Sequence, residues 1–165
     1  MIDVRQALLD DEPELRRIDL VTWSPQNSPS SGPDNPDEYR FFEAGHTTPD
    51  DVLVAVREGR IAGWVKLTPA THLRSNQHVK MIGGLAVDPE HQGGGVGRIL
   101  VEAAVERARQ QGARKVSLRV LGGNAVARRL YERCGFVVEG VLKGEFVREG
   151  RYVDDVFMAR YLPAR

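Results

Sequence analysis

The sequence predicts an α/β (α+β) fold, in which a mixed, mostly antiparallel central sheet carries helices on both faces. Two Arg-Glu-Gly-Arg segments, each lying between apolar runs of strand length, are typical of hairpins and therefore of antiparallel pairs. In the second half of the chain, two amphipathic helical patterns alternate with strand-like runs, as expected for helices packed on a sheet. The expected order is strand, helix, loop, three strands, helix, strand, helix and two strands.

The composition is ordinary for a soluble globular protein and favours a single domain over residues 1–165. Apolar residues make up 41% and charged residues 28% of the 165 positions. The 23 basic side chains balance 23 acidic ones, so no bulk charge attracts nucleic acid or an acidic membrane. Neither is an expected partner.

Several features that the sequence lacks indicate the cellular compartment and exclude some kinds of site. Cys134 is the single cysteine, which excludes an internal disulfide and a cysteine-based zinc site. The chain begins without the basic and apolar regions of a signal peptide, and no run approaches the ~20 apolar residues of a membrane helix. We therefore expect a cytoplasmic protein with no metal.

The first fifty residues predict one strand, one helix and a long connection. Residues 2–7 read as a strand, and residues 11–20 as a helix with Pro13 in its first turn. Periodicity is lost over residues 23–50, which are rich in turn-forming residues, although residues 37–44 suit one or two helical turns. The sequence leaves open whether this connection is an ordered substrate-side loop or is disordered.

Three neighbouring strands and a helix are expected next. Residues 52–56 and 61–67 flank the first Arg-Glu-Gly-Arg turn, and residues 79–87 form the third strand. Gly83 and Gly84 predict a bulge or a close approach within that strand. The apolar residues from Val96 onward fall on one helical face, with Gly112 as the stop.

The last part of the chain predicts strand, helix, strand, strand. Residues 116–120 alternate as a half-buried strand, and residues 124–134 form a helix capped by Asn124 and ended by Gly135. Residues 136–142 and 152–161 read as two closing strands. The second of them is apolar enough for an exposed edge or a homodimer interface.

The segment Gln92-Gly93-Gly94-Gly95-Val96-Gly97-Arg98 lies between a predicted strand and a predicted helix. Free amides and the positive end of the helix dipole favour binding of an anion there, and the expected ligand is a phosphate or pyrophosphate. A P-loop is excluded because Gly97 is followed by Arg98-Ile99, and the dinucleotide fingerprint is excluded because its third glycine is absent. The alternative is a flexible surface loop.

A second informative stretch is the helix from Asn124. Tyr131 lies seven residues after Asn124 and near the same helix face, with Ala127 between them. Taken alone, Asn124 is a helix cap, Tyr131 a core aromatic and Cys134 a small buried residue.

Together the two stretches resemble the GNAT superfamily of N-acetyltransferases over residues 52–162. The glycine loop is similar to the superfamily's Gln/Arg-x-x-Gly-x-Gly/Ala loop, and Asn124…Tyr131…Gly135-Phe136 is similar to its later motif. Residues 143–156 resemble the branch of phosphinothricin, amino-acid and ribosomal-protein alanine N-acetyltransferases.

The resemblance implies acetyl-CoA as co-substrate and a GNAT-like sheet whose central strands splay apart to admit it. The implied cofactor-binding residues are Leu85, Ala86, Val87, Gln92, Gly93, Gly94, Gly95, Val96, Gly97, Arg98, Asn124, Ala127 and Tyr131. It also implies direct transfer of the acetyl group to a primary amine of a small, amino-acid-like substrate, with Tyr131 as the catalytic proton donor and with dimerisation common in such folds. The alternatives are an N-terminal or peptide acetyltransferase and, in a different class, a non-catalytic acyl-CoA-binding sensor.

The general base is not identified by these motifs. Many relatives carry a glutamate on the strand before the glycine loop, whereas residues 80–85 here contain no carboxylate. An α-amine with a pKa near ~7.8 needs less help to lose its proton than a lysine-type amine near ~10.4, so the sequence favours a weakly basic acceptor. Glu43, His78 and Asp155 are the candidates for a substrate-side base acting through water.

Overall fold

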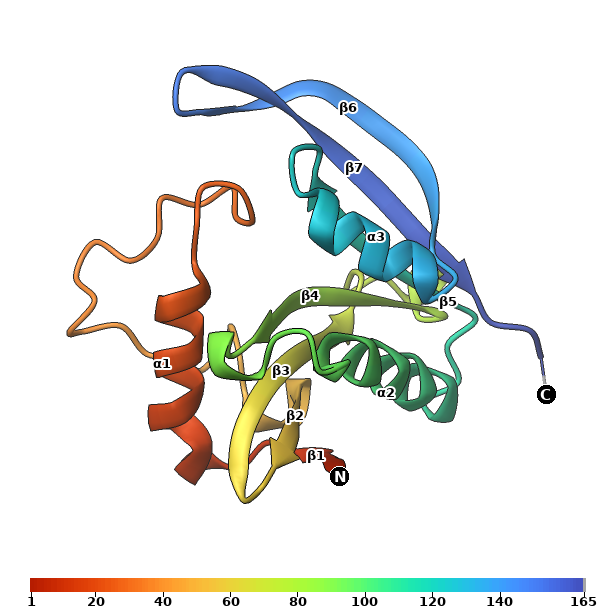
Figure 1. Ribbon diagram of the computed structural model, residues 1–165. Coiled ribbons are helices and arrows are strands. Elements are labelled where there is room, and N and C mark those ends of the chain that lie inside the picture. Colours follow the sequence, from red (N-terminus) through yellow and green to blue (C-terminus); the bar gives the residue numbers. More distant parts are fainter. Residues whose placement is uncertain (165) are drawn as a thin grey trace.

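The computed structural model describes residues 1–164 and contains one seven-stranded sheet in the order β1-β2-β3-β4-β5-β7-β6 (Figure 1). The strands and helices follow the predicted order: β1 (Ile2–Gln6), α1 (Glu12–Thr22), β2 (Val52–Arg57), β3 (Arg60–Pro69), β4 (Val79–Val87), α2 (Val96–Gln110), β5 (Lys115–Leu121), α3 (Ala125–Arg133), β6 (Val137–Arg148) and β7 (Arg151–Tyr161). Short 3-10 turns lie between them at η1 (Leu9–Asp11), η2 (Pro49–Asp51), η3 (Arg74–Asn76) and η4 (Pro89–His91).

The sheet is mixed and mostly antiparallel, as predicted, because β4 and β5 form its single parallel pair within residues 1–164. That pair is short: Val79–Ile82 lie beside Lys115–Leu118, and the ladder ends there. Residues 84–87 of β4 stay paired with β3, whereas residues 119–121 of β5 stay paired with β7. The two central strands therefore diverge toward the start of α2, as the resemblance implied.

A bulge in β4 precedes this divergence. Lys66 pairs with Gly84 and Leu67 with Ile82, which leaves Gly83 as the extra residue. A Cβ on Gly84 would lie 2.8 Å from two ring atoms of Trp64. Both the predicted bulge and the predicted close approach are present.

Helices cover both faces of the sheet. On one face, α2 packs over β1 to β4 and touches α3, and the larger core lies beneath them around Leu100, Val116 and Phe136. On the other face, α1 packs over β3 and β4, with a smaller core around Leu15, Ile18 and Trp64. No helix within residues 1–164 is long and apolar enough to cross a membrane.

The two Arg-Glu-Gly-Arg turns have the conformation that tight hairpins require. Glu58 and Gly59 have φ of 52° and 75°, and Glu149 and Gly150 have φ of 50° and 74°. Two successive residues with positive φ give a turn whose twist matches that of the strands it joins. Because β7 lies between β5 and β6, the edge of the sheet at this end is β6 and not the predicted strand 152–161.

Two further predictions are wrong in detail. Residues 37–44 contain no helix: the chain makes a turn at residues 36–38, runs along α1 and then enters the bridge between Glu43 and Thr47. The Glu12 carboxylate accepts hydrogen bonds from the amides of Phe41 (2.7 Å) and Phe42 (2.8 Å), and this tertiary contact replaces helical pairing. The closing strand expected at residues 136–142 is β6, which continues to Arg148 across an irregular pairing between Leu142 and Phe146.

Candidate active site

The glycine loop forms an open cradle of backbone amides at the N-terminus of α2. Gly95 precedes the helix with φ of +79° and supplies no capping side chain. The first helical bond joins the Ile99 amide to the Gly95 carbonyl (3.1 Å), so the amides of residues 96–98 have no acceptor within the helix. Nothing lies within 4 Å of where a Cβ would stand on Gly93 or Gly95. The loop therefore fits an anion of phosphate type.

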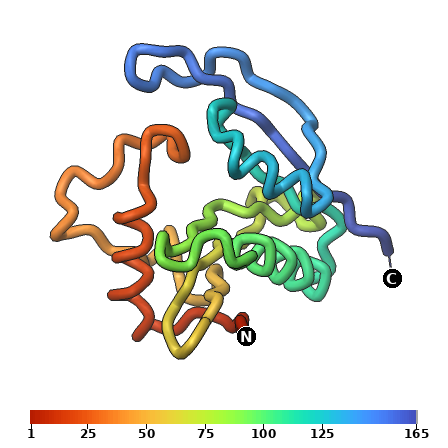
Figure 2. Tube along the Cα trace, viewed as in Figure 1, coloured from red at the N-terminus to blue at the C-terminus, as the bar shows by residue number. Residues whose placement is uncertain are grey.

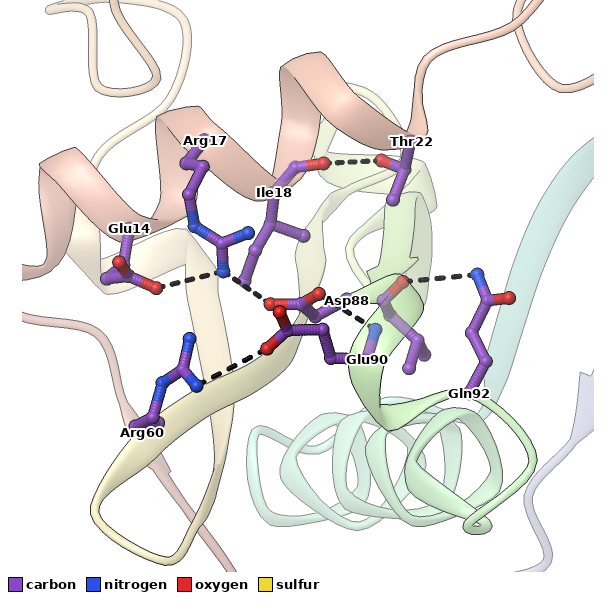
Figure 3. A network of polar contacts seen from close by, with 9 residues as sticks. Glu14, Arg17, Ile18, Thr22, Arg60, Asp88, Glu90 and Gln92 are labelled. Carbon is purple, nitrogen blue, oxygen red and sulfur yellow. Dashed lines mark hydrogen bonds and ion pairs between the residues drawn. The ribbon is translucent and has the colours of Figure 1, made fainter.

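A buried carboxylate connects this loop to α1 (Figure 3). The Asp88 side chain is 1% exposed, accepts a hydrogen bond from Arg17 Nη2, and accepts another from the Glu90 amide (3.1 Å). Arg17 also contacts Glu14 on α1 (3.1 Å). Burial by itself raises the pKa of Asp88, and the bonds from Arg17 and Glu90 lower it by more, so this pKa lies below the ordinary value. The ionised side chain thus fixes the point at which β4 turns toward the cradle.

We expect Asp88→Asn to destabilise the protein by about 1–2 kcal/mol at neutral pH, because the bonds from Arg17 and the Glu90 amide lose their charged acceptor while Arg17 keeps partial access to water. A group with a lowered folded-state pKa stabilises the fold above its unfolded pKa of about 3.9, and this contribution is lost as pH falls through the folded-state value. Urea unfolding at several pH values should therefore show the two proteins converging in acid. Glu90→Gln is the matched control, because the Glu90 side chain is 65% exposed in its 3.3 Å pair with Arg60. A constant difference down to strong acid would contradict this role of Asp88.

The divergence of β4 from β5 frees one edge of β4 beside the cradle. The Asp88 amide donates to Ala62 on β3 (2.9 Å), and backbone groups along a strand alternate in direction. The amides of Leu85 and Val87 therefore face away from β3, and the Val87 carbonyl accepts a bond from Gln92 Nε2 on that side (3.4 Å). An extended, polar ligand can pair with this edge as an added strand would.

A cavity of about 860 Å³ continues from this free edge. Its walls are α1 with residues 23–33, the β4 segment 81–86, the end of β5 with the start of α3, and the β6–β7 hairpin. Figure 2 shows the chain after α1 rising toward the tip of that hairpin. Arg148 of the hairpin donates hydrogen bonds to the carbonyls of Pro25 (3.5 Å), Pro29 (3.4 Å) and Ser30 (3.1 Å), which joins the two walls. These bonds hold residues 25–30 against the hairpin, and residues 23–33 border the cavity.

Tyr131 on α3 faces this cavity from the core side. Its side chain is 8% exposed and packs against Phe136, with ring centroids 5.9 Å apart. Burial raises the pKa of Tyr131 to about 12, with a smaller contribution from Cys134. No group of residues 1–164 hydrogen-bonds its hydroxyl. A hydroxyl in this setting stays protonated at neutral pH and has its donor uncommitted.

The structure brings most of the predicted site residues together. Six of them line the cavity, and these are Leu85, Ala86, Asn124, Ala127, Tyr131 and Asp155. Val87 and residues 92–98 lie beyond its end, at the cradle. Asn124 caps α3 as predicted, with its Oδ1 accepting from the Ala127 amide (3.2 Å).

Of the three residues predicted as a substrate-side base, only one lines the cavity. Glu43 lies in a small bridge with Thr47, and His78 precedes β4 at the end where β4 and β5 still pair, so neither lines the cavity. Asp155 lines the cavity but is bound to Arg119, whose Nε and Nη2 both donate to its Oδ2. It is a neutralised carboxylate and not a free base.

Two cavity residues were not among the predictions. Asp19 on α1 and Tyr39 in the following loop line the cavity, and the Tyr39 hydroxyl donates to Asp19 Oδ2. A sequence signal for Asp19 exists: it stands four residues after Leu15 and beside Ile18, on the apolar stripe of α1, where an acid is out of place. Tyr39 gives no such signal, because residues 23–48 have no periodicity.

Comparison with known proteins agrees with this geometry. A sequence model described as the acetyltransferase (GNAT) family matches residues 13–136. Phosphinothricin N-acetyltransferase from Alcaligenes faecalis is 35% identical over 115 residues, covering 68% of this chain and 57% of that enzyme. Spermidine N(1)-acetyltransferase from Vibrio cholerae is 36% identical over 103 residues, covering 62% and 57%. The chain thus spans little more than half the length of these curated relatives.

Among solved structures, a phosphinothricin acetyltransferase from Sinorhizobium meliloti in complex with AcCoA has a TM-score of 0.79. It is 20% identical over 98% of this chain and 88% of that one, which is a likeness of fold. The family match, in contrast, rests on the sequence itself and spans more than half of the chain. The chain therefore belongs to the acetyltransferase (GNAT) family.

Proposed function

We propose that this protein is an acetyl-CoA-dependent N-acetyltransferase that transfers an acetyl group directly to the primary amine of a small, amino-acid-like substrate. One observation carries the proposal: the amide cradle at α2, the free edge of β4 and the Tyr131 hydroxyl follow one another along a single path into the cavity. The family membership and the AcCoA complex of the Sinorhizobium meliloti relative support the same ligand.

The residues on this path would have separate roles in cofactor binding and in proton transfer. Amides of the glycine loop would hold the pyrophosphate, and the free backbone groups of Leu85 and the free amide of Val87 would pair with the pantetheine arm. Acetyl-CoA supplies the acetyl group as an activated thioester. A backbone amide at the free edge of β4 would stabilise negative charge on the thioester oxygen, while Tyr131 would give its proton to the departing sulfur.

An amino-acid-like acceptor is favoured by an unused hydrogen-bond donor on a residue that lines the cavity. Arg119 donates hydrogen bonds from Nε and Nη2 to Asp155. Its guanidinium lies over the Phe157 ring, with Cζ 4.9 Å from the ring centroid. Its Nη1 has no partner within the part of the chain that the structure describes. A free guanidinium nitrogen on a cavity-lining side chain suits a substrate carboxylate.

The test is a thiol-release assay with acetyl-CoA against α-amino acids, phosphinothricin, polyamines, aminoglycosides and short peptides. We expect turnover on amino-acid-like amines and no more than weak turnover on the other groups. Turnover confined to peptides would favour an N-terminal acetyltransferase. Tight acetyl-CoA binding by calorimetry with no turnover on any amine would favour a non-catalytic sensor, and no binding would refute the proposal.

We also propose that copies of the chain pair through β6. This edge strand carries several exposed apolar side chains, namely Val137, Val138, Val141, Leu142 and Val147. An unpaired apolar edge is a natural site for pairing between chains. Light scattering should give twice the mass of one chain, and lysine substitutions at Val138 and Val141 should give monomers.

A further inference from the structure

Asp19 differs from the other carboxylates that the fold encloses. Asp88 and Asp155 are almost fully buried, and each is bound to an arginine, Arg17 and Arg119 respectively. Asp19 is half-buried and lines the cavity, yet no cationic side chain of residues 1–164 pairs with it. Removing a carboxylate from water without a cation is costly, so its retention here suggests a cationic partner that is not part of the chain.

Tyr39 fixes this carboxylate without neutralising it. The Tyr39 hydroxyl donates to Asp19 Oδ2, and Oδ1 has no partner within the described residues. Burial raises the pKa of Asp19, and the Tyr39 bond lowers it by less, so the carboxylate is more basic than usual. The same bond and the same burial raise the pKa of Tyr39, which keeps it a donor.

Among the charged residues that line the cavity, Asp19 is the one whose charge has no counterion within residues 1–164. Its ionisable lining residues are Asp19, Tyr39, Arg119, Tyr131 and Asp155. Arg119 and Asp155 neutralise each other, and both tyrosines are uncharged at neutral pH. From α1 itself, the Glu12 charge acts on Tyr39. On the sheet side, the cavity wall is Trp64 with residues 81–86 of β4, which carry no charge.

We propose that Asp19 is a catalytic residue that binds the ammonium group of the acceptor and removes its proton, and that Tyr39 is the positioning residue for it. This assignment rests on the proposed acetyltransferase function and deepens it. It also defines the substrate class: a small primary ammonium whose second charge, a carboxylate, reaches Arg119.

The bonds and protons of this step balance. One N–H bond of the ammonium breaks, its proton goes to Asp19, and the lone pair stays on nitrogen. The nitrogen then forms the new N–C bond while the C–S bond of the thioester breaks, and the sulfur takes the Tyr131 proton. The amide nitrogen returns its surplus proton to Tyr131, and the proton on Asp19 passes to solvent. The net products are the amide, a free thiol and one proton.

The test compares the full-length wild type with Asp19→Asn, which keeps the shape and removes the base. With the best α-amino acid acceptor, kcat/KM should fall about 100-fold at neutral pH, within the usual scale for one acid or base. The deficit should shrink as pH rises past the pKa of the amine, since the amine then arrives neutral. Acetyl-CoA affinity measured by calorimetry should not change, and thermal stability should be equal or higher, because an unpaired carboxylate is removed.

Tyr39→Phe and Asp37→Asn complete the set. Without the Tyr39 bond the pKa of Asp19 rises, so Tyr39→Phe should move the acid limb of kcat/KM to higher pH, which a merely structural role would not do. Asp37 is exposed on the same loop, and its substitution should change nothing. If Asp19→Asn retains at least half of the wild-type kcat/KM, the assignment is wrong and the acetyltransferase stands. If the wild type acetylates no amine, the proposed function fails and the assignment fails with it.

Discussion

Tyr131→Phe is expected to lower kcat of thiol release by about 10- to 1,000-fold, the range usual for one proton donor. Tyr131 lines the cavity, no group of residues 1–164 accepts its proton, and with a pKa of about 12 the hydroxyl stays protonated throughout the neutral range. A thiolate with a pKa near ~8.5 is a fair leaving group, so the donor assists without being indispensable. Steady-state kinetics at saturating acetyl-CoA would measure the loss, which should not vary with pH near neutrality.

The fold should tolerate this change, because phenylalanine keeps the ring that packs on Phe136. Tyr152→Phe is the matched control: Tyr152 is 80% exposed on β7, so neither turnover nor stability should respond. Unchanged turnover in Tyr131→Phe would remove this residue from the proposed mechanism.

Gly63→Ala should destabilise the protein by about 3 kcal/mol, at the upper end of the usual cost of overpacking. A Cβ on Gly63 would stand 2.6 Å from the Ala86 carbonyl oxygen and 3.2 Å from the Val87 Cα. Both are backbone atoms of β4, so relief requires that β4 move away from β3. Because that segment carries the free edge beside the cradle, affinity for acetyl-CoA should fall as well. Urea unfolding and calorimetry would measure the two effects.

Gly140→Ala provides the comparison, since Gly140 on β6 has nothing within 4 Å of its Cβ position and does not have a positive φ. The stability of the Gly140→Ala variant should be unchanged or slightly higher, because alanine loses less backbone conformational entropy than glycine on folding. An unaltered unfolding midpoint for Gly63→Ala would mean that β3 and β4 separate at little cost.

The parts of the fold that sequence predicts well are those decided by local chemistry. Each Glu-Gly pair of the hairpin turns takes up positive φ where the flanking strands require it, and Gly83 forms the bulge where a strand pattern is interrupted. Asn124 caps α3 because a short polar side chain reaches the free amides of the next turn. In each case the deciding interactions lie within a few residues of the position itself or of its paired strand.

Other parts depend on contacts between distant segments. Residues 37–44 suit a helix locally, but Glu12 binds the amides of Phe41 and Phe42 and holds the chain extended along α1. Tyr39 reaches the cavity only because of that path, so no local pattern reveals it. The presence of Asp19 on an apolar helical stripe was visible in the sequence, but the absence of a cationic partner becomes evident only in three dimensions.

The hydrogen bonds of Arg148 have a consequence for how the protein assembles. They join residues 25–30 to a hairpin more than a hundred residues later, so this wall of the cavity cannot close until Arg148 has left the ribosome. Contacts between segments so far apart in sequence also form slowly, because a long loop must close before they contribute. The cradle at α2 is held by contacts between nearer residues, namely Gln92 with Val87, 5 residues apart, and Arg17 with Asp88, 71 residues apart. The nascent protein should therefore acquire a place for the acetyl donor before it acquires one for the acceptor.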